Sequence, residues 1–582
     1  MNVFSHFRKV IIAALESLVT QGFLPGDLDF AKVTAEPPKE AVHGDIATNA
    51  AMVLAKQARM NPREIAALLC QQLQQNEQIT TAEVAGPGFV NLRIRDEFWQ
   101  QCLQNILKQG CSYGDSDMGQ ATPVNLEYVS VNPTGPMHIG HCRGAVAADI
   151  LGSILQKAGY QVTREYYIND AGNQANLLAH SVYQRYLEAL GQHAQDFGEY
   201  PGDYLIPVGQ ALSEKYADQW VGVPESEWLE PIRTFAVAAM MDVIRHDLSL
   251  LGIHHEIFTS EKAIISQGET EEAFKVLEDQ GLIYQGTLPP PKGKKPEEWV
   301  SEELTLFRST DFGDDSDRAL RKPDGSWSYF SGDIAYHWDK VRRGYKLLID
   351  VWGSDHVGYV KRLNAAVQAL SQGNVEFEVQ LCQLVKFMDK GKPVKMSKRA
   401  GTFIAVNDVV GRVGKDSVRF MMVTRKNDVP LDFDFAKVLE QSKDNPVFYV
   451  QYAHARACSI KRHIKELFPT LEVSADNLAK ANLALLDNQE DIELVKLLAQ
   501  WPRQIELAAK TREPHRIAYY LYNVASAFHA LWTKGKDQTE LRFLYASDQE
   551  KTLARFALVQ AMAFVIASGL EVMGVKPVEE MR

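Results

Sequence analysis

Two short motifs carry residues that could do phosphate chemistry. The first is His138-Ile139-Gly140-His141, which ends a loop rich in glycine and proline and opens a predicted helix. Free N–H groups at a helix N-terminus and a glycine that permits close approach both suit a phosphate. Two histidines can also donate hydrogen bonds to a developing phosphoryl charge. A helix cap with two surface histidines, or a metal-binding pair, would use the same residues, although no third ligand lies nearby in sequence.

The second motif is Lys395-Met396-Ser397-Lys398, which follows a turn-rich stretch. A mobile basic loop can close over a triphosphate and neutralise charge that moves onto pyrophosphate. Taken alone, a solvated run of lysines is the simpler interpretation. The two motifs in this order, about 250 residues apart, are far more specific than either one, and no G-x-x-x-x-G-K-[ST] motif competes with them.

The elements around the first motif predict an α/β fold. The run 123–131 has the pattern of a strand, 132–141 of a loop, 142–160 of a helix and 161–168 of a second strand. A strand, a helix and a strand in this order make a βαβ unit, so we expect a parallel, Rossmann-type sheet. Three more strand-like runs, over 328–337, 345–356 and 377–388, return to this sheet, and mostly amphipathic helices fill 180–310.

The remainder of the chain divides by pattern. Residues 1–112 combine helical stretches, one of them opened by Pro62, with a Gly-Pro-Gly turn and the alternating apolar run Val90, Leu92 and Ile94, which predicts a small α+β domain. Residues 113–410 hold both motifs, 411–445 are expected to be connecting helices, and 446–582 form an all-helical domain.

Composition limits the class of protein. The 582 residues are 46% hydrophobic and 23% charged, which is ordinary for a soluble globular protein. No apolar run reaches the roughly 18 residues of a membrane span, and the N-terminus resembles a first helix and not a signal peptide. The net charge of −12 argues against a DNA-coating protein, but residues 446–582 are near neutral, with 17 Lys and Arg against 16 Asp and Glu. Six cysteines without a C-x-x-C pair favour reduced thiols in a cytosol and make zinc unlikely.

The paired motifs resemble the HIGH and KMSK signatures of class I aminoacyl-tRNA synthetases. Three longer stretches are similar to the arginyl-tRNA synthetases within that class: LEYVSVNPTGPMHIGH (126–141), NPVFYVQYAHARACSI (445–460) and VAGPGFVNLRI (84–94), and the C-terminal EVMGVKP also fits. Many arginyl enzymes lack an intact KMSK motif, whereas this chain has one. The resemblance covers nearly the whole chain.

The resemblance implies a two-step reaction. The carboxylate of L-arginine attacks the α-phosphate of ATP, and the 2′-hydroxyl of the terminal adenosine of tRNA(Arg) then attacks the arginyl-adenylate. It implies that ATP binds with Mg²⁺, that tRNA is needed even for the first step, and that the enzyme is a cytoplasmic monomer that binds neither DNA nor a membrane. It assigns 1–112 to the tRNA D-loop, 113–410 to catalysis and 446–582 to the anticodon.

The resemblance also implies roles for single residues. Because a guanidinium group is planar and always charged, a site that selects it should offer carboxylates. Each residue has a simpler structural interpretation too: surface acids at strand ends, a core Phe89 with Asn91 in a turn, and a buried Tyr452 beside a surface Arg456. The implied roles are catalysis for His138, His141, Lys395 and Lys398; ATP binding for Gly140, Gly353, Asp355, His356, Met396 and Ser397; arginine binding for Glu127, Ser130, Asn132, Tyr329, Asp333 and Gln174; and tRNA binding for Phe89, Asn91, Tyr452 and Arg456.

Two other functions compete with this one. A cysteinyl or glutamyl enzyme would share both motifs, but the first normally uses zinc and the second needs cations where Glu127 and Asp333 are acids. A synthetase-derived protein that binds tRNA without catalysis is the alternative of a different class, and the intact HIGH and KMSK motifs argue against it.

Overall fold

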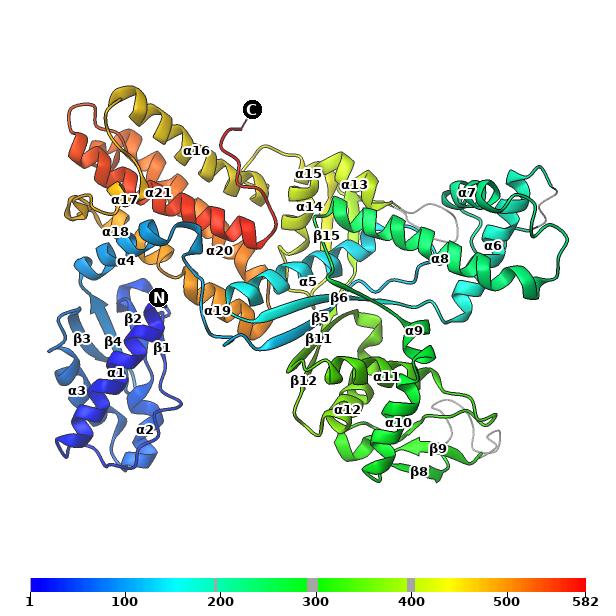
Figure 1. The fold of residues 1–582 in the computed structure, drawn as a ribbon. Helices are drawn as coiled ribbons and strands as arrows, with labels where there is room; N and C mark the ends of the chain where they lie inside the picture. The colour runs from blue at the N-terminus through cyan, green and yellow to red at the C-terminus, as the bar shows by residue number, and fades with distance from the viewer. Residues whose placement is uncertain (1, 193–195, 290–301, 395–403, 582) are drawn as a thin grey trace. The chain divides into compact units, whose positions relative to one another are not determined.

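The computed structural model describes residues 2–192, 196–289, 302–394 and 404–581 (Figure 1). The chain forms two compact units. Unit 1 combines residues 1–116 with 441–511 and 516–582, and unit 2 combines 117–440 with 512–515.

Unit 2 is built on a five-stranded sheet in which every pair of neighbouring strands is parallel, in the order β12-β11-β5-β6-β7. This confirms the Rossmann-type prediction. Helix α5 connects β5 to β6 and packs along the sheet (Figure 1). The bounds are β5 Pro123–Glu127, α5 Ile139–Lys157, β6 Gln161–Ile168, β7 Ile257–Ser260, β11 Leu347–Gly353 and β12 Glu376–Cys382.

The strand register brings three acidic residues side by side. Glu127 at the end of β5 pairs with Asp350 on β11 and with Glu165 on β6. Strand β5 ends at Glu127 and does not continue to residue 131 as predicted, because Val129 (φ 70°) and Ser130 (φ 40°) have left-handed backbone angles. Such angles are costly for residues with a Cβ and are typical of functional sites.

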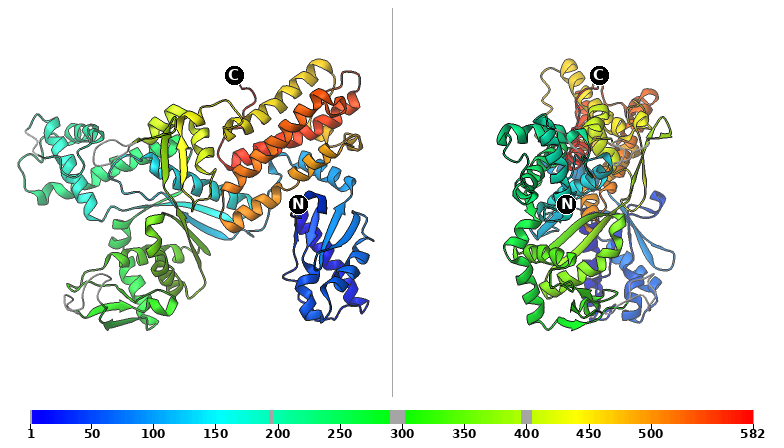
Figure 2. Two further views of the ribbon diagram at one scale, coloured as in Figure 1. Left: turned by 180° about the vertical axis from the view of Figure 1, so that it is seen from behind. Right: turned by 90° about the vertical axis from the view of Figure 1, so that its right-hand side faces the viewer.

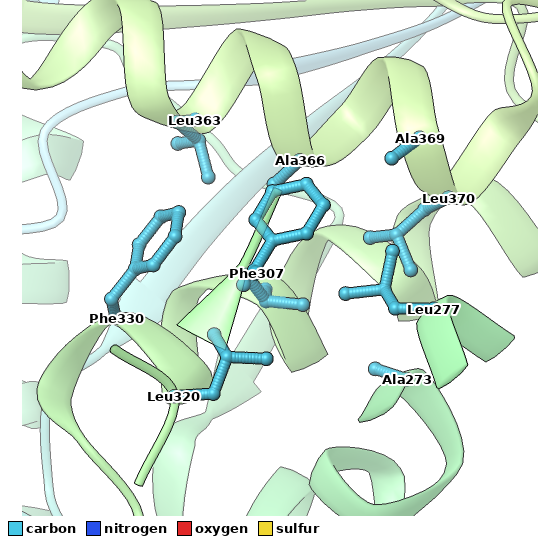
Figure 3. Packing of buried hydrophobic residues seen from close by; sticks show 10 residues of the cluster. Ala273, Leu277, Phe307, Leu320, Phe330, Leu363, Ala366, Ala369 and Leu370 are labelled. Atoms are coloured by element: carbon cyan, nitrogen blue, oxygen red, sulfur yellow. The ribbon is translucent and has the colours of Figure 1, made fainter. Parts of the chain in front are cut away.

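Helices and a small second sheet surround the carboxyl ends of these strands. Strands β8, β9 and β10 form an antiparallel sheet whose apolar side packs against α10, α11 and α12, with Phe307 in the centre and Leu277, Leu320 and Leu370 around it (Figure 3). The bounds are α6 Asn173–Ala189, α7 Ile206–Tyr216, α8 Glu225–Leu250, α9 Glu261–Ser266, α10 Glu269–Asp279, β8 Ile283–Gly286, β9 Leu304–Phe307, β10 Arg318–Ala319, α11 Tyr329–Arg342 and α12 Val360–Ser371.

The predicted strand over 328–337 is wrong, because this segment is the start of helix α11. Aromatic and β-branched residues favour a strand locally. The buried positions Phe330, Ile334 and His337 nevertheless recur three and four residues apart, which puts them on one helical face. Residues 180–310, for which mostly helices were predicted, instead contain the paired strands β7, β8 and β9.

The segment 411–445 is also more than connecting helices. It contains the C-terminal end of α13 (Val406–Val413), then α14 (Lys415–Met422) and α15 (Phe435–Val438). It also contains strand β15 (Leu431–Asp434), which pairs in parallel with β13 (Val385–Asp389), itself paired with β14 (Lys392–Pro393). Four residues are too few for an alternating pattern to stand out in the sequence.

Unit 1 contains a four-stranded antiparallel sheet, in the order β1-β2-β4-β3, and a set of helices. Pro62 opens α3 after the capping side chain of Asn61, as predicted. Helices α16 and α21 run side by side (Figure 2). The bounds are α1 Val3–Thr20, β1 Ala35–Glu36, β2 Ile46–Thr48, α2 Ala50–Ala58, α3 Pro62–Leu73, β3 Ile79–Ala85, β4 Phe89–Ile94, α4 Asp96–Gln109, α16 Pro446–Leu467, α17 Ala475–Leu478, α18 Gln489–Leu498, α19 Trp501–Thr511, α20 His515–Asp537 and α21 Gln549–Val572.

Helix α21 is long and apolar enough to cross a membrane by length and composition, with a mean hydropathy of 1.8 over its most apolar window. Arg555 and Glu571 nevertheless bound its uncharged part, so no uninterrupted apolar run within it reaches the length of a membrane span. Of that window, 83% is buried inside the protein, so α21 is a core helix of unit 1.

Candidate active site

The HIGH motif forms the N-terminus of α5. His138 is the N-cap residue, and its Nδ1 accepts a hydrogen bond from the Gly140 N–H at 3.1 Å. The rings of His138 and His141 are stacked, with their centroids 3.7 Å apart. A Cβ on residue 140 would lie 2.9 Å from the His138 ring, so only glycine leaves room for this arrangement. Both imidazoles therefore stand together at a helix N-terminus, where an anion is favoured.

Main-chain contacts hold this loop in place. The buried carboxylate of Asp247, on α8, accepts a hydrogen bond from the Met137 N–H at 2.8 Å. Ile139 N–H donates to Ile404 O at 3.0 Å, and Val406 N–H donates to Met137 O at 3.2 Å. The HIGH loop is thus bonded to Ile404 and Val406, which lie a few residues after the KMSK motif in the chain. Lys395, Met396, Ser397 and Lys398 themselves lie outside the described residues.

Acidic side chains gather around Tyr167 at the carboxyl ends of β5, β6 and β7, and we call this group of Glu127, Tyr167, Glu261 and Asp333 the acidic pocket. Asp333, on the first turns of α11, accepts a hydrogen bond from the Tyr359 hydroxyl. Glu261, the first residue of α9, has a buried Oε2 without a hydrogen-bond partner. The buried hydroxyl of Tyr167, on β6, also lacks a partner. Buried polar atoms normally have a hydrogen-bond partner, so these two oxygens are available to a ligand or to water.

The electrostatics of this pocket favour a cation. Burial raises the pKa of Asp333 to about 6, with Asp350 adding to the shift and Tyr359 and His337 opposing it. Burial, Asp333 and Asp170 together raise the pKa of Glu261 to about 7. Burial and the carboxylates of Glu261, Asp333 and Glu127 raise the pKa of Tyr167. A cationic ligand would relieve this repulsion, because an opposite charge stabilises ionised carboxylates.

Tyr329 lies at the rim of the pocket. Its side chain is 69% exposed, and its hydroxyl accepts a hydrogen bond from Asn169 Nδ2 at 3.4 Å. Burial of the hydroxyl group, followed by the charges of Asp333 and Glu261, raises its pKa. The hydroxyl therefore faces the acidic side of the pocket while the ring remains open to solvent.

Glu127 is buried and already has protein partners, so it is not a surface acid at a strand end. Its Oε1 accepts a hydrogen bond from Ser130 Oγ at 3.0 Å, and its Oε2 accepts one from Lys340 Nζ at 2.6 Å. Ser130 Oγ also accepts from the Tyr167 N–H at 3.1 Å, which connects the two strand ends. Because a carboxylate has about four lone-pair positions, Glu127 can still accept a hydrogen bond from a ligand.

The three buried residues Glu127, His337 and Asp350 could in principle hold a metal ion, since their ligand atoms all lie within 4.8 Å of one another. Lys340 Nζ lies 2.6 Å from Glu127 and 3.1 Å from Asp350, and so fills the place of a cation. These residues therefore do not fit a metal site.

The remaining predicted ligands are exposed. Asn132 Nδ2 donates to Gln174 Oε1 at 2.7 Å, which brings two predicted arginine ligands together. Gly353 ends β11, and a Cβ there would lie 2.5 Å from the Asp355 carboxylate, so glycine lets the following turn close. The imidazole of His356 is 63% exposed and lies 3.6 Å from Asp355.

In unit 1, the outer face of β4 carries an aromatic ring, an amide and a cation. Phe89, Asn91 and Arg93 alternate with the buried Val90 and Leu92. Phe89 is 42% exposed, so its interpretation as a core residue is wrong. An exposed ring beside an amide is an arrangement that binds unpaired bases.

Tyr452 and Arg456 belong to one cluster on α16. Arg456 donates to the Tyr452 hydroxyl at 3.0 Å, and its guanidinium group lies 4.2 Å from the centre of the Tyr452 ring. The other side of the guanidinium contacts His529 Nδ1 at 2.9 Å, and His529 Nε2 lies 3.1 Å from Tyr449 O. Burial lowers the pKa of His529 to about 4, so this ring is neutral and can accept from Arg456.

Three pocket residues were missed by sequence reasoning: Tyr167, Glu261 and Lys340. In the sequence, Tyr167 has the pattern of an ordinary strand residue. Glu261 has the pattern of an acidic residue in the first turn of a helix, where acidic residues are common. Lys340 reads as a surface lysine near the end of α11, yet it is fully buried. Only the positions of their partners on other elements reveal their roles.

Three family models match successive parts of the chain. The arginyl tRNA synthetase N terminal domain matches residues 5–94, the tRNA synthetases class I (R) catalytic domain matches 102–445, and the DALR anticodon binding domain matches 450–581. The catalytic model alone covers more than half of the chain.

Relatives of known function and solved structures agree with these models. The arginine–tRNA ligase of Ruegeria pomeroyi is 55% identical, and that of Rhodospirillum rubrum 53% identical, over the full length of both chains. Two solved arginyl-tRNA synthetases share the fold. The structure from Thermus thermophilus has a TM-score of 0.73 and 19% sequence identity, and the match covers 99% of this chain and 100% of that one. The structure from Plasmodium falciparum has a TM-score of 0.72 and 14% sequence identity, and the match covers 100% of this chain and 99% of that one. The chain therefore belongs to the arginyl-tRNA synthetases, class I enzymes that activate L-arginine with ATP and transfer it to the 2′-hydroxyl of the terminal adenosine of tRNA(Arg).

Proposed function

We propose that the acidic pocket of unit 2 binds the guanidinium group of arginine. Asp333, Glu261 and Glu127 supply carboxylates, and Tyr167 supplies a hydroxyl that can accept one N–H. The observation that carries this proposal is the pair of buried, unpartnered oxygens, Tyr167 Oη and Glu261 Oε2, beside carboxyls whose pKa values are raised. A guanidinium group brings five N–H donors and a positive charge, which satisfies both needs together. Tyr329 would cover the bound group from the rim, and Ser130, Asn132 and Gln174 would bind the ammonium end of the substrate.

Arginine binding should release protons between pH 6 and 7. The carboxyls of Asp333 and Glu261 are partly protonated in the empty pocket, with pKa values of about 6 and about 7. The bound cation favours their ionised forms, so affinity rises with pH through this window and levels off above it. For each carboxyl that must lose its proton on binding, KM for arginine rises by about tenfold for each pH unit below the pKa of that carboxyl.

Calorimetry in two buffers of different ionisation enthalpy measures the protons released directly, and Glu261→Gln should reduce their number. A proton count of zero across this window would overturn the proposed pocket. The KM for ATP, measured over the same range, serves as the internal control.

The HIGH and KMSK residues are proposed to act on the triphosphate. His138 and His141 would contact the α-phosphate, and Lys395 and Lys398 the β- and γ-phosphates, with Gly140, Met396 and Ser397 lining the nucleotide. Gly353, Asp355 and His356 would contact its ribose and the arginine. No protein nucleophile is needed, because positioning and charge stabilisation carry the reaction. We expect Mg²⁺ to arrive with the phosphates of ATP, since Lys340 fills the buried ligand cluster that the described residues offer.

Unit 1 is proposed to bind tRNA(Arg) at two places. Residues 1–112 would contact the D-loop through Phe89 and Asn91, and residues 446–582 would contact the anticodon through Tyr452 and Arg456. Residues 113–410 would form the catalytic domain, linked by 411–445. The exposed ring of Phe89, next to the Asn91 amide on the same strand face, supports the first contact.

Replacing Phe89 by alanine should raise KM for tRNA by about 5- to 150-fold, because stacking on an aromatic ring contributes about 1–3 kcal/mol per base. The KM values for arginine and ATP should not change. Phe23→Ala is the matched control, since Phe23 is an exposed phenylalanine of the same unit at 53% exposure. Equal KM values for tRNA in the two variants would show that Phe89 makes no stacking contact.

We also propose that the enzyme is a cytoplasmic monomer. The six cysteines are free thiols, and burial raises the pKa of Cys70 and Cys382 to about 11, which keeps these two protonated and unreactive. Sedimentation with and without tRNA measures the oligomeric state, and a dimer in both conditions would contradict the proposal.

A further inference from the structure

Lys340 is a fully buried lysine beside Glu127. Its ammonium group donates to Glu127 Oε2 at 2.6 Å and to Asp350 Oδ1 at 3.1 Å, and it lies 4.3 Å from the centre of the Tyr336 ring. The second oxygen of Asp350 lies 3.1 Å from His337 Nε2. A buried charge costs several kcal/mol unless it is paired, so this arrangement requires an explanation.

The strand register explains why a cation is needed here. Glu127, Glu165 and Asp350 face one another across three adjacent parallel strands. Glu165 has its own partner, because Arg343 donates to both of its oxygens at 2.8 and 2.9 Å. Glu127 and Asp350 have Lys340 between them. Without that ammonium group, one of the two buried carboxyls would take up a proton, as happens when two carboxylates share a site.

We propose that Lys340 is a positioning residue, whose ammonium group keeps Glu127 ionised and fixes its carboxylate for the guanidinium group of arginine. This inference rests on the proposed role of Glu127 in binding arginine. Lys340 does not face the substrate itself. It acts through Glu127. Its ammonium group occupies the position where Glu127, His337 and Asp350 could otherwise bind a metal ion.

The groups that face Glu127 come from every element packed around it, and they are Lys340, His337 and Tyr336 on α11, Asp350 on β11, Glu165 and Tyr167 on β6, and Ser130 after β5. Burial and Asp350 raise the pKa of Glu127, whereas Lys340 and His337 lower it. Removing Lys340 therefore leaves burial and Asp350 to favour the protonated form. A protonated Glu127 carries no charge and has an oxygen that must donate, which repels a guanidinium N–H.

Lys340→Met keeps most of the length of the side chain and removes the ammonium group. At pH 7 we expect KM for arginine to rise at least tenfold, with KM for ATP unchanged. As the pH rises from 6.5 to 8.5, KM for arginine in the variant should fall back toward the wild-type value by about tenfold for each pH unit, because Glu127 regains its charge. A purely structural defect would not be repaired by alkali.

Arg343→Met is the matched control, because Arg343 is a cation of the same helix that pairs with Glu165 and not with Glu127. It should leave the pH dependence of KM for arginine as in wild type. Should Lys340→Met fail to fold, the double variant Lys340→Met/Asp350→Asn removes one charge of each sign. The double variant leaves Glu127 without its ammonium partner, and burial alone then raises its pKa, so KM for arginine should still fall as the pH rises, but at a lower pH than in Lys340→Met.

Glu127→Gln separates the two levels of the proposal. If it leaves KM for arginine unchanged, the role of Glu127 in the proposed function fails. If it raises KM for arginine at every pH, but a folded Lys340→Met or double variant has the wild-type KM, only the role of Lys340 is overturned. The role of Lys340 would also be overturned if KM for arginine is raised in these variants and does not fall as the pH rises.

Discussion

Replacing Asp333 by asparagine should lower kcat/KM for arginine by about 10²–10³. The variant keeps the shape of the side chain, and its amide can still accept from the Tyr359 hydroxyl that now donates to Asp333 Oδ2. It loses the negative charge that would face the guanidinium group. Removing one partner of a buried charge pair costs about 2–5 kcal/mol, most of it as a higher KM for arginine.

The same variant should discriminate less well between arginine and citrulline, whose side chain ends in a neutral group of similar shape. We expect the wild-type enzyme to reject citrulline, because Asp333 and Glu261 would then be left without a cationic partner. Charging of tRNA(Arg) with each amino acid measures the ratio. Asp339→Asn is the control, since Asp339 lies on the same helix and pairs with Arg343. An unchanged kcat/KM for arginine in Asp333→Asn would remove Asp333 from the binding site.

Local patterns were sufficient to predict the centre of the fold. Strand, glycine-rich loop, helix and strand follow one another between residues 123 and 168, and the right-handed βαβ rule leaves few other arrangements. The same reasoning placed the HIGH motif in the loop between the first strand and the helix that follows it. These conclusions depend only on neighbours in sequence.

The rest of the site depends on contacts between distant residues, which one sequence does not reveal. Glu127 and Lys340 are 213 residues apart along the chain and 2.6 Å apart in space. Tyr167 lies on a strand that was predicted correctly, but nothing in the sequence shows that its hydroxyl is buried without a partner. The error over 328–337 has the same origin: aromatic residues favour a strand locally, and packing of α11 against α10 and α12 decides for a helix.

Replacing His138 by asparagine should lower the rate of arginine activation by about 10²–10³ without loss of stability. Loss of one hydrogen-bond donor to a developing oxyanion has an effect of about this size. Asparagine is among the best N-cap residues, so it can replace the bond that His138 Nδ1 now accepts from the Gly140 N–H. ATP–pyrophosphate exchange, measured with tRNA present, gives the rate, and KM for arginine should remain within about threefold of wild type because arginine is bound by other residues.

His138→Ala is the companion variant that separates catalysis from capping. It should lose the same activity as His138→Asn, and in addition about 1 kcal/mol of stability, because alanine cannot cap α5. If the imidazole only caps the helix, the asparagine variant will keep its activity and the alanine variant will lose both. A large loss of rate in both variants, with a lower thermal midpoint in the alanine variant alone, would place the His138 ring at the reacting phosphate, since the cap is then intact in an inactive enzyme.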